Sequence, residues 1–234
     1  MSNINVDPDE IEKFQALASR WWDSESEFKP LHDINPLRVG YIESHCDGLK
    51  DKKILDIGCG GGILCEALAL KGAIVSGIDM ANKALKVAKL HLLESKLDID
   101  YQLSTAEDYA AVHAAGFDLV TCLEMLEHVP DPGSIVSGAA KLLKPDGQLF
   151  FSTINRNPRS FVLAIVGAEY ILNLLPKGTH EYQKFIKPSE LAAEARANQL
   201  EVRDITGMTY NALTKRYKLG SNIEVNYLMH CSFL

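Results

Sequence analysis

Four absences limit what this chain of 234 residues can do. Its five cysteines are odd in number and form no Cys-x-x-Cys pair, which argues against a disulfide framework or a zinc knuckle and favours a reduced, cytosolic compartment. No stretch reaches the roughly 18 apolar residues of a membrane-spanning helix. The polar, acidic start MSNINVDPDE predicts no signal peptide. The net charge of -7 predicts no nucleic-acid partner, because neutralising phosphates takes clustered Lys and Arg.

The apolar content of the chain, 47% of residues, is enough for one large core, and we expect a single domain over 1–234. From KKILDI onward, short buried strands alternate with helices, a pattern of right-handed crossovers in a parallel sheet. The predicted fold class is α/β, with a doubly wound, mostly parallel seven-stranded sheet. Two prolines in SESEFKPLHDINPL predict a loop, with a helix beginning near Pro36. The predicted parts are an N-terminal helical cap (1–50), a cofactor-binding core (51–155), an insertion with a helix after the fifth strand (156–190), and a C-terminal helix with antiparallel strands (191–234).

A glycine-rich loop follows the first predicted strand. The segment LDIGCGGG places Gly58, Gly60 and Gly62 where this strand turns into a helix. Glycines let a backbone approach a ligand closely, and ligands of doubly wound sheets bind at the carboxyl ends of the strands. Asp79 ends the next strand, the usual place for a carboxylate that accepts both hydroxyls of a ribose. A dinucleotide fingerprint requires Gly or Ala where this chain has Ile63, so hydride transfer is disfavoured.

This loop resembles the G-x-G-x-G motif of class I S-adenosylmethionine-dependent methyltransferases, including an aspartate two residues before its first glycine. In that family the residues at the end of the second strand contact the cofactor. A small and an acidic residue near the adenine ring correspond to a pair in STAEDY, although an acid in a first helical turn also stabilises the helix dipole. The residue that ends the fourth strand would pack against the cofactor. The cofactor contacts implied here are Asp56, Asp79, Met80, Ala106, Glu107 and Leu123.

A closer resemblance is to the bacterial ubiquinone biosynthesis O-methyltransferase family. It covers most of the chain through FQALASRWWDSESEFKPLHDINPLRVGYI, LDIGCGGGIL, CLEMLEHVPDP, FFSTINRN, VGAEYILNLLPKGTHEYQKFIKP and YKLGSNIEVNYL. The resemblance implies methylation of catechol-type hydroxyls on polyprenylated rings by S-adenosylmethionine, early and late in ubiquinone biosynthesis. The implied substrates are of the 2-polyprenyl-6-hydroxyphenol and 3-demethylubiquinol types. It also implies that Arg38 contacts the cofactor, whose methionine moiety carries a carboxylate that a guanidinium can bind.

Three ionisable residues, Glu124, Glu127 and His128, follow the fourth strand in CLEMLEHVPDP and are our candidate catalytic group. Positions i, i+3 and i+4 share one face of a helix, so the trio is predicted to converge. Two devices would help a phenol, whose pKa is about 10, lose its proton. One is a divalent metal such as Mg²⁺ held by all three residues, as eukaryotic members of the family imply. The other is His128 as a general base without a metal. A purely structural role stays open.

The run from Phe161 to Leu175 is apolar, with Glu169 as its one charge. Such a helix is too short to span a bilayer, but it can lie in the interface while cations meet anionic headgroups. The flanking basic residues are Arg156, Arg159, Lys177, Lys184 and Lys187. We therefore expect peripheral association with the inner face of the cytoplasmic membrane. The expected partners are anionic lipids, a polyprenylated phenol or quinol, and other ubiquinone-pathway enzymes. A buried cap helix is the alternative, and Trp21 and Trp22 belong either to such a lid or to the core.

Two other functions compete with this one. The first is a methyltransferase for another small acceptor, which assays with a prenylated catechol and with soluble amines or acids would distinguish. The second is a membrane-surface protein that binds the cofactor without catalysis, which would yield bound cofactor and no methylated product.

Overall fold

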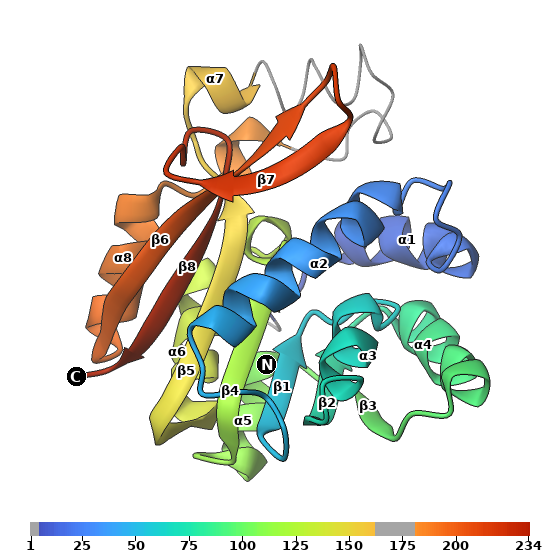
Figure 1. The fold of residues 1–234 in the computed structure, drawn as a ribbon. Helices are drawn as coiled ribbons and strands as arrows, with labels where there is room; N and C mark the ends of the chain where they lie inside the picture. Colours follow the sequence, from blue (N-terminus) through green and yellow to red (C-terminus); the bar gives the residue numbers. More distant parts are fainter. Residues whose placement is uncertain (1–4, 162–180) are drawn as a thin grey trace.

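The computed structural model describes residues 5–161 and 181–234, which fold around one eight-stranded sheet (Figure 1). The predicted interfacial helix within 161–175 lies almost wholly outside these residues. The described helices are α1 (Pro8–Leu17), η1 (Ala18–Arg20), α2 (Lys29–Ser44), α3 (Ile63–Ala69), α4 (Asn82–Ser95), α5 (Ala106–His113), η2 (Leu126–His128), α6 (Pro132–Leu142), α7 (Pro158–Ser160), η4 (Tyr182–Lys184) and α8 (Pro188–Ala197). The strands are β1 (Lys53–Ile57), β2 (Ile74–Asp79), β3 (Ile99–Leu103), β4 (Phe117–Leu123), β5 (Leu143–Ile154), β6 (Leu200–Asn211), β7 (Arg216–Gly220) and β8 (Asn226–Phe233).

The strand order is β3-β2-β1-β4-β5-β8-β6-β7. Strands β1 to β5 pair in parallel, while β8, β6 and β7 are antiparallel to their neighbours. The predicted α/β class and doubly wound sheet are confirmed, as is the late antiparallel pair. The predicted count of seven strands is wrong by one, because β7 adds a short edge strand whose charged sequence RYKLG carries little hydrophobic signal. The chain order reverses between β1 and β4, and a ligand site is expected at their carboxyl ends.

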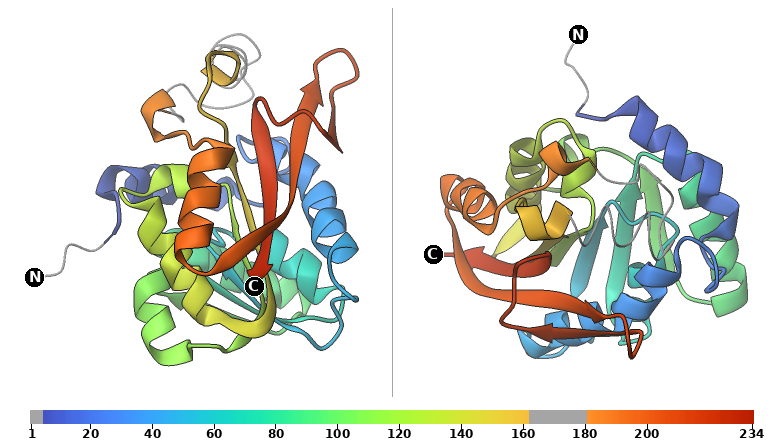
Figure 2. Two further views of the ribbon diagram at one scale, coloured as in Figure 1. Left: turned by 90° about the vertical axis from the view of Figure 1, so that its left-hand side faces the viewer. Right: turned by 90° about the horizontal axis from the view of Figure 1, so that it is seen from above.

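Helices cover both faces of this sheet (Figure 2). Successive side chains of a strand point to opposite faces of the sheet. Adjacent apolar residues such as Ile54 and Leu55 of β1 therefore pack in two different cores. Ile54 packs in a cluster with apolar residues of α2, α3 and α4. Leu55 packs in another cluster with residues of α5, α6 and α8. Burial on both faces fixes the register of the central strands, and with it the position of the loops that follow them.

The N-terminal cap differs from its prediction in one respect. The helix predicted to begin near Pro36 begins at Lys29 instead, with Pro30 in its first turn and Pro36 in its interior. A proline is favourable in a first turn, where its missing N–H would have no partner, but it costs a hydrogen bond inside a helix. The buried face of α2, including Ile34 and Ile42, keeps this helix continuous through Pro36.

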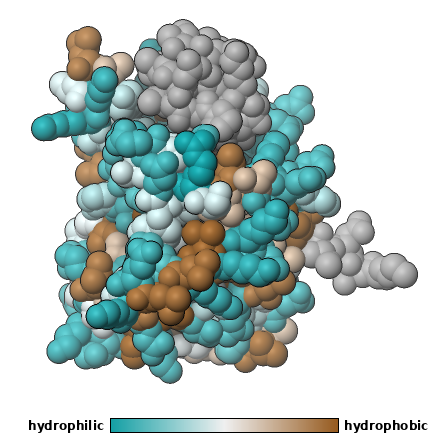
Figure 3. Space-filling view, turned by 90° about the vertical axis from the view of Figure 1, so that its right-hand side faces the viewer, coloured by the Kyte–Doolittle hydropathy of each residue, from teal (hydrophilic) through white to brown (hydrophobic). Residues whose placement is uncertain are grey.

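Among the described helices, none is long and apolar enough to cross a membrane. The face of the molecule seen in Figure 3 is mostly hydrophilic, but hydrophobic side chains gather in a patch on its lower half. Leu90 and Leu93 of α4 are exposed.

Candidate active site

A cavity of about 860 Å³ lies at the carboxyl ends of β1, β2 and β4. Its size is in the range of small-molecule sites. The structure brings most of the predicted site residues to this one space. Those lining it are Arg38, Asp56, Gly58, Gly60, Asp79, Met80, Ala106, Leu123, Glu124, Glu127 and His128.

The glycine loop is tied to the end of β2. The backbone N–H of Gly60 donates to Oδ2 of Asp79 at 2.8 Å, and that of Ala81 donates to Oδ1 at 2.7 Å. Gly60 has a φ of +53°, and a Cβ there would lie 2.1 Å from the ring of Trp21. Burial raises the pKa of Asp79, and the backbone hydrogen bonds partly offset this. Asp79 therefore holds the loop in shape as well as facing the cavity.

Both tryptophans of the cap contact this loop. Trp21 lines the cavity, is 6% exposed and stacks on Phe28 with ring centroids 4.1 Å apart. The Nε1–H of Trp22 donates to the carbonyl of Gly61 at 2.9 Å, and its ring stacks on His91. The cap thus covers the glycine loop. Trp21 belongs both to this lid over the loop and to the buried core.

Arg38 projects a buried guanidinium into the cavity. Its side chain is 6% exposed, and Nη2 lies 3.4 Å from Oε1 of Glu124. Nε and Nη2 have no hydrogen-bond partner within the described part of the chain. Buried donors normally have partners, so two unsatisfied nitrogens in a cavity wall fit an anionic ligand group. The carboxylate of a methionine moiety has this chemistry.

Asp56 is a buried carboxylate, at 4% exposure. Its Oδ1 accepts from the hydroxyl of Thr121 at 2.7 Å and its Oδ2 from the thiol of Cys65 at 3.5 Å. Burial raises the pKa of Asp56 to about 6, although Thr121 and Cys65 act to lower it. The carboxylate mainly joins β1, β4 and α3 beneath the loop.

Two predicted cofactor residues, Gly62 and Glu107, do not line the cavity. Gly62 precedes α3 with a φ of +88°, and a Cβ there would lie 2.2 Å from the hydroxyl of Tyr101, so packing requires glycine. The carboxylate of Glu107 accepts from Ser134 at 2.6 Å and from Asn5 at 3.1 Å. Glu107 therefore joins α5 to α6. This agrees with the alternative given above, in which Glu107 is an acidic residue of a first helical turn.

The three predicted catalytic residues do not share a helical face. Glu124 has a φ of +54°, and only residues 126–128 form a short 3₁₀ turn. Glu124 accepts from Ser152 at 2.6 Å and from Asn226 at 3.0 Å. Glu127 accepts from the hydroxyl of Thr153 at 2.8 Å. The prediction that a regular helical turn brings the trio together is wrong, because β4 extends to Leu123 and the chain turns sharply after it.

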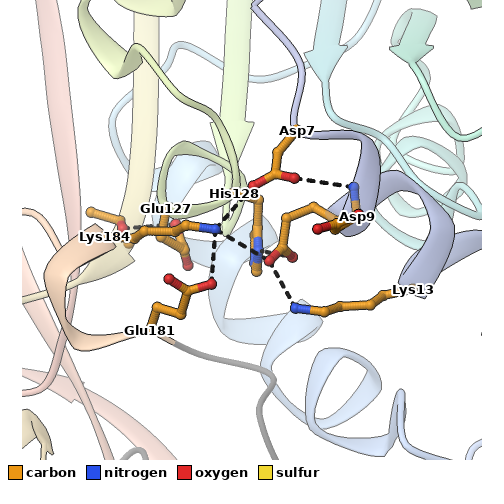
Figure 4. Close-up of polar contacts among 9 residues, drawn as sticks. Asp7, Asp9, Lys13, Glu127, His128, Glu181 and Lys184 are labelled. Atoms are coloured by element: carbon orange, nitrogen blue, oxygen red, sulfur yellow. Dashed lines mark hydrogen bonds and ion pairs between the residues drawn. The ribbon is translucent and has the colours of Figure 1, made fainter.

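His128 faces the cavity and an unexpected partner in the cap. Its Nδ1 lies 2.9 Å from Oε2 of Glu10, a residue 118 positions away (Figure 4). Burial acts to lower the pKa of His128, but the hydrogen bond with Glu10 and the charges of Glu127 and Glu124 raise it overall. Burial raises the pKa of Glu127, which the charge of His128 offsets only in part. The imidazole is therefore a stronger base than an isolated histidine.

A metal centre does not fit this arrangement. Over residues 5–161 and 181–234, no group of three His, Cys, Asp or Glu side chains is placed to hold a metal ion. The oxygens of Glu124 accept hydrogen bonds from Ser152 and Asn226, while Glu127 and His128 are directed to Thr153 and Glu10. The predicted ligands thus point to three different partners rather than to a common point.

Residues of the antiparallel end of the sheet form another wall of the cavity. Met208, Tyr210 and Tyr217 come from β6 and β7, and Asn226 begins β8. The rings of Tyr210 and Tyr217 lie 4.7 Å apart across the two strands. Sequence reasoning missed these residues and Glu10. The segment YKLGSNIEVNYL gave a signal for Tyr217 and Asn226, through its place in the family resemblance, but does not include Met208 or Tyr210.

The comparisons with known proteins agree with this geometry. A family model described as a methyltransferase domain matches residues 44–205. Among solved structures, the chain is similar to magnesium protoporphyrin IX methyltransferase from Synechocystis PCC 6803 with bound SAH, with a TM-score of 0.68, 19% identity, and coverage of 97% of this chain and 94% of that one. At this identity the likeness concerns the fold alone. The fold and the site define a class I S-adenosylmethionine-dependent methyltransferase.

Two curated relatives narrow this class. The chain is 62% identical over 232 residues to the ubiquinone biosynthesis O-methyltransferase of Marinobacter nauticus, covering 98% of this chain and 97% of that protein. It is 63% identical over 225 residues to the protein of the same name from Thiobacillus denitrificans, covering 96% and 97%. The chain belongs to the family of ubiquinone biosynthesis O-methyltransferases, which confirms the predicted enzyme class and methyl donor.

Proposed function

We propose that this enzyme methylates a catechol-type hydroxyl on a polyprenylated aromatic ring, at both the early and the late O-methylation step of ubiquinone biosynthesis. One observation carries the proposal. One cavity joins the glycine loop, a largely buried histidine and a wall of apolar and aromatic residues, so a methyl donor and an aromatic acceptor would occupy the same space.

The cofactor end of the cavity would hold S-adenosylmethionine. Arg38 would bind its carboxylate through nitrogens that have no hydrogen-bond partner among residues 5–161 and 181–234, and Asp79 would accept from its ribose hydroxyls. Ala106 and Leu123 supply apolar surface for its base and ribose. When bound, this cofactor supplies a methyl group on a positively charged sulfur that becomes neutral as the methyl leaves.

His128 would act as the general base for the acceptor hydroxyl. A phenol has a pKa of about 10, so its deprotonation at neutral pH needs a base. Because the pKa of His128 is raised, it lies closer to the pKa of the phenol. A smaller difference between the two pKa values favours proton transfer from the hydroxyl to the imidazole. Tyr217 and Met208 would contact the ring of the acceptor.

A divalent metal is the alternative aid to deprotonation. Because the three candidate ligands point to separate partners, we assign the proton to His128 and derive no step through a metal. We expect turnover to persist after thorough chelation. Loss of turnover that Mg²⁺ restores, with cofactor binding intact, would assign the role to a metal instead.

The His128→Ala variant tests the proposal. We expect the rate to fall on the order of 10²–10⁴-fold and to recover in part at high pH, where the phenol ionises without help. Cofactor affinity should stay unchanged in calorimetry. His113→Ala, at an exposed position, is the control and should keep its rate. A His128→Ala enzyme with the wild-type rate would contradict the assignment.

We also propose that the acceptor arrives from the inner face of the cytoplasmic membrane. Its polyprenyl tail is membrane-soluble, and Phe161, at the start of the apolar run, is 43% exposed. The predicted role of the flanking cations is reduced, because Arg156 pairs with Glu190 and Arg159 with Glu224. The apolar run itself is therefore the main candidate for lipid contact.

A further inference from the structure

Helix α1 is amphipathic in an unusual way. Of its ten residues, the one that is buried is a glutamate, Glu10, at 5% exposure. Ionised carboxylates are seldom buried unless they are paired, because desolvation disfavours the charge. The position of Glu10 therefore needs an explanation from its contacts.

The two oxygens of Glu10 have different partners. Oε2 lies 2.9 Å from Nδ1 of His128. Oε1 accepts from the ammonium of Lys13 at 2.9 Å and lies 3.5 Å from that of Lys184 (Figure 4). Burial acts to raise the pKa of Glu10, but the hydrogen bonds from His128 and Lys13 outweigh it and lower the pKa to about 2. The two lysines keep this carboxylate anionic while its other oxygen faces the imidazole.

A second residue of the same helix face contacts the imidazole. Phe14 is four positions after Glu10, so both project from one side of α1. Its ring meets that of His128 edge-on, at 5.2 Å between centroids and an angle of 87°. One oxygen and one ring edge, both from the cap, thus fix the position of His128.

The cap is itself held in place beside the active site. Lys184 of η4, within the predicted insertion (156–190), donates to Asp7 at 3.1 Å and lies 3.1 Å from Glu181. Asp7 caps the start of α1 by accepting from the backbone N–H of Asp9. Several charged groups surround His128. They are Asp7 at the N-cap of α1, Glu10 and Lys13 from α1, Glu124 and Glu127 from its own segment, and Glu181 and Lys184 from the segment at η4.

We propose that Glu10 is a positioning residue for methyl transfer, which holds the imidazole of His128 toward the acceptor so that the N-terminal cap completes the active site. When Glu10 accepts a hydrogen bond from Nδ1–H, the lone pair of the neutral imidazole is on Nε2. Nε2 is then the nitrogen that takes the hydroxyl proton. The carboxylate also stabilises the imidazolium formed in that step. This inference rests on the proposed role of His128 as the base.

Glu10→Gln tests the inference with two measurements on the full-length enzyme. The first is the titration of His128, followed by NMR of protein labelled at histidine Cε1, with its signal assigned by the loss of one peak in His128→Ala. The second is the pH dependence of kcat/KM with S-adenosylmethionine and a short-chain prenylated catechol. We expect the His128 midpoint and the acidic limb of kcat/KM to shift together to lower pH. We also expect the high-pH plateau to fall about 10- to 100-fold, a part of the contribution of a general base.

Two variants serve as controls. Glu12→Gln removes a charge from an exposed position of the same helix and should change neither measurement. Glu10→Asp keeps the charge, so its His128 midpoint should stay closer to that of the wild type than in Glu10→Gln. Cofactor affinity and thermal melting show that the variants are folded, and Glu10→Asp provides the test should Glu10→Gln fail to fold.

The outcomes separate this inference from the function beneath it. An unchanged His128 midpoint in Glu10→Gln would overturn the role of Glu10 while leaving the base assignment intact. The other outcome has two parts: the His128 midpoint shifts in Glu10→Gln while the acidic limb of kcat/KM stays in place, and His128→Ala keeps its rate. This outcome would show that His128 is not the base, and it would overturn both the role of Glu10 and the proposed role of His128.

Discussion

Asp79 is the residue whose two tasks, holding the glycine loop and facing the cofactor, can be measured separately. Asp79→Ala removes a charged acceptor, and we expect S-adenosylmethionine binding to weaken by about 1.5–3 kcal/mol in calorimetry. Asp100→Ala, at an exposed position of the neighbouring strand β3, should bind like the wild type. Unchanged affinity in Asp79→Ala would reject the ribose assignment.

Asp56 gives a pH dependence of stability. Its pKa is raised from 3.8 to about 6 in the folded chain, so the folded state holds this proton more tightly than the unfolded state does. The contribution of Asp56 to the free energy of unfolding should therefore fall as pH rises between these two values, by about 3 kcal/mol for a difference of this size. Asp56→Asn cannot ionise and should gain stability relative to the wild type across that window. Chemical denaturation at several pH values measures this, and a difference that stays constant with pH would contradict it.

At this scale the sequence predicted the residues that a local motif fixes. Asp79 and His128 reach the cavity because both come at or after the end of a core strand, whereas Arg38 was expected from the family resemblance. Glu10 could not be predicted, because its partner lies 118 positions away and an acid in a first helical turn is ordinary. Glu124 and His128 line one cavity, but the helical turn predicted to join them was wrong, because the sequence gives no sign that Glu124 has a positive φ.

The hairpin of β6 and β7 is the element we expect to shape the acceptor end. Gly207 and Gly220 face each other across these strands. A Cβ on Gly207 would lie 1.7 Å from the carbonyl of Asn222, whereas one on Gly220 meets nothing within 4 Å. Gly207→Ala should therefore displace the segment between β7 and β8, which lines the cavity, at a cost of about 1–3 kcal/mol in stability.

We expect Gly207→Ala to raise KM for the prenylated catechol while leaving cofactor affinity unchanged. Gly220→Ala is the matched control and should stay within about 0.5 kcal/mol of the wild type in stability, with the same KM. Steady-state kinetics with both variants decide the matter. Equal KM values for the two would separate the hairpin from acceptor binding.

Elements with strong apolar periodicity were predicted well, and those without it were not. The core strands each carry neighbouring apolar residues such as Ile54 and Leu55, which a strand buried on both faces requires. β7 alternates between exposed and half-buried residues and offers no such pattern. The start of α2 was misplaced because the segment with Pro30 was read as a loop and Pro36 as the helix start, while Pro30 itself is compatible with a helix start.

For the whole molecule, the expected association with membranes gives a further prediction. We expect the enzyme to co-sediment with anionic vesicles and to keep much of that binding in high salt. The reason is that Arg156, Arg159 and Lys184 already form ion pairs within the protein, which leaves less charge for headgroups.

The double variant Ile165→Asp and Leu172→Asp should lose this binding and keep its cofactor affinity. Both positions lie outside the described residues, so this expectation depends on the apolar sequence of the run. Leu90→Asp with Leu93→Asp, on the exposed side of α4, is the matched control and should still co-sediment. Wild-type enzyme that stays in the supernatant would show that the acceptor arrives by another route.

At this scale, the handedness of crossover connections made the doubly wound order of the sheet predictable, since few arrangements satisfy it. How the N-terminal cap meets the active site was not predictable. It depends on packing of α1 against the loop after β4, through side chains such as Glu10 and Phe14.

Transfer of a labelled methyl group tests the account most directly. The full-length enzyme is incubated with S-adenosylmethionine carrying a deuterated methyl group and a short-chain prenylated catechol, and the products are analysed by mass spectrometry. We predict one deuterated methyl group on a ring oxygen of the catechol, formed by the wild type and by His113→Ala but at a much lower rate by His128→Ala. An enzyme that binds the cofactor yet leaves the catechol unlabelled, or that labels soluble amines or acids instead, would contradict the account.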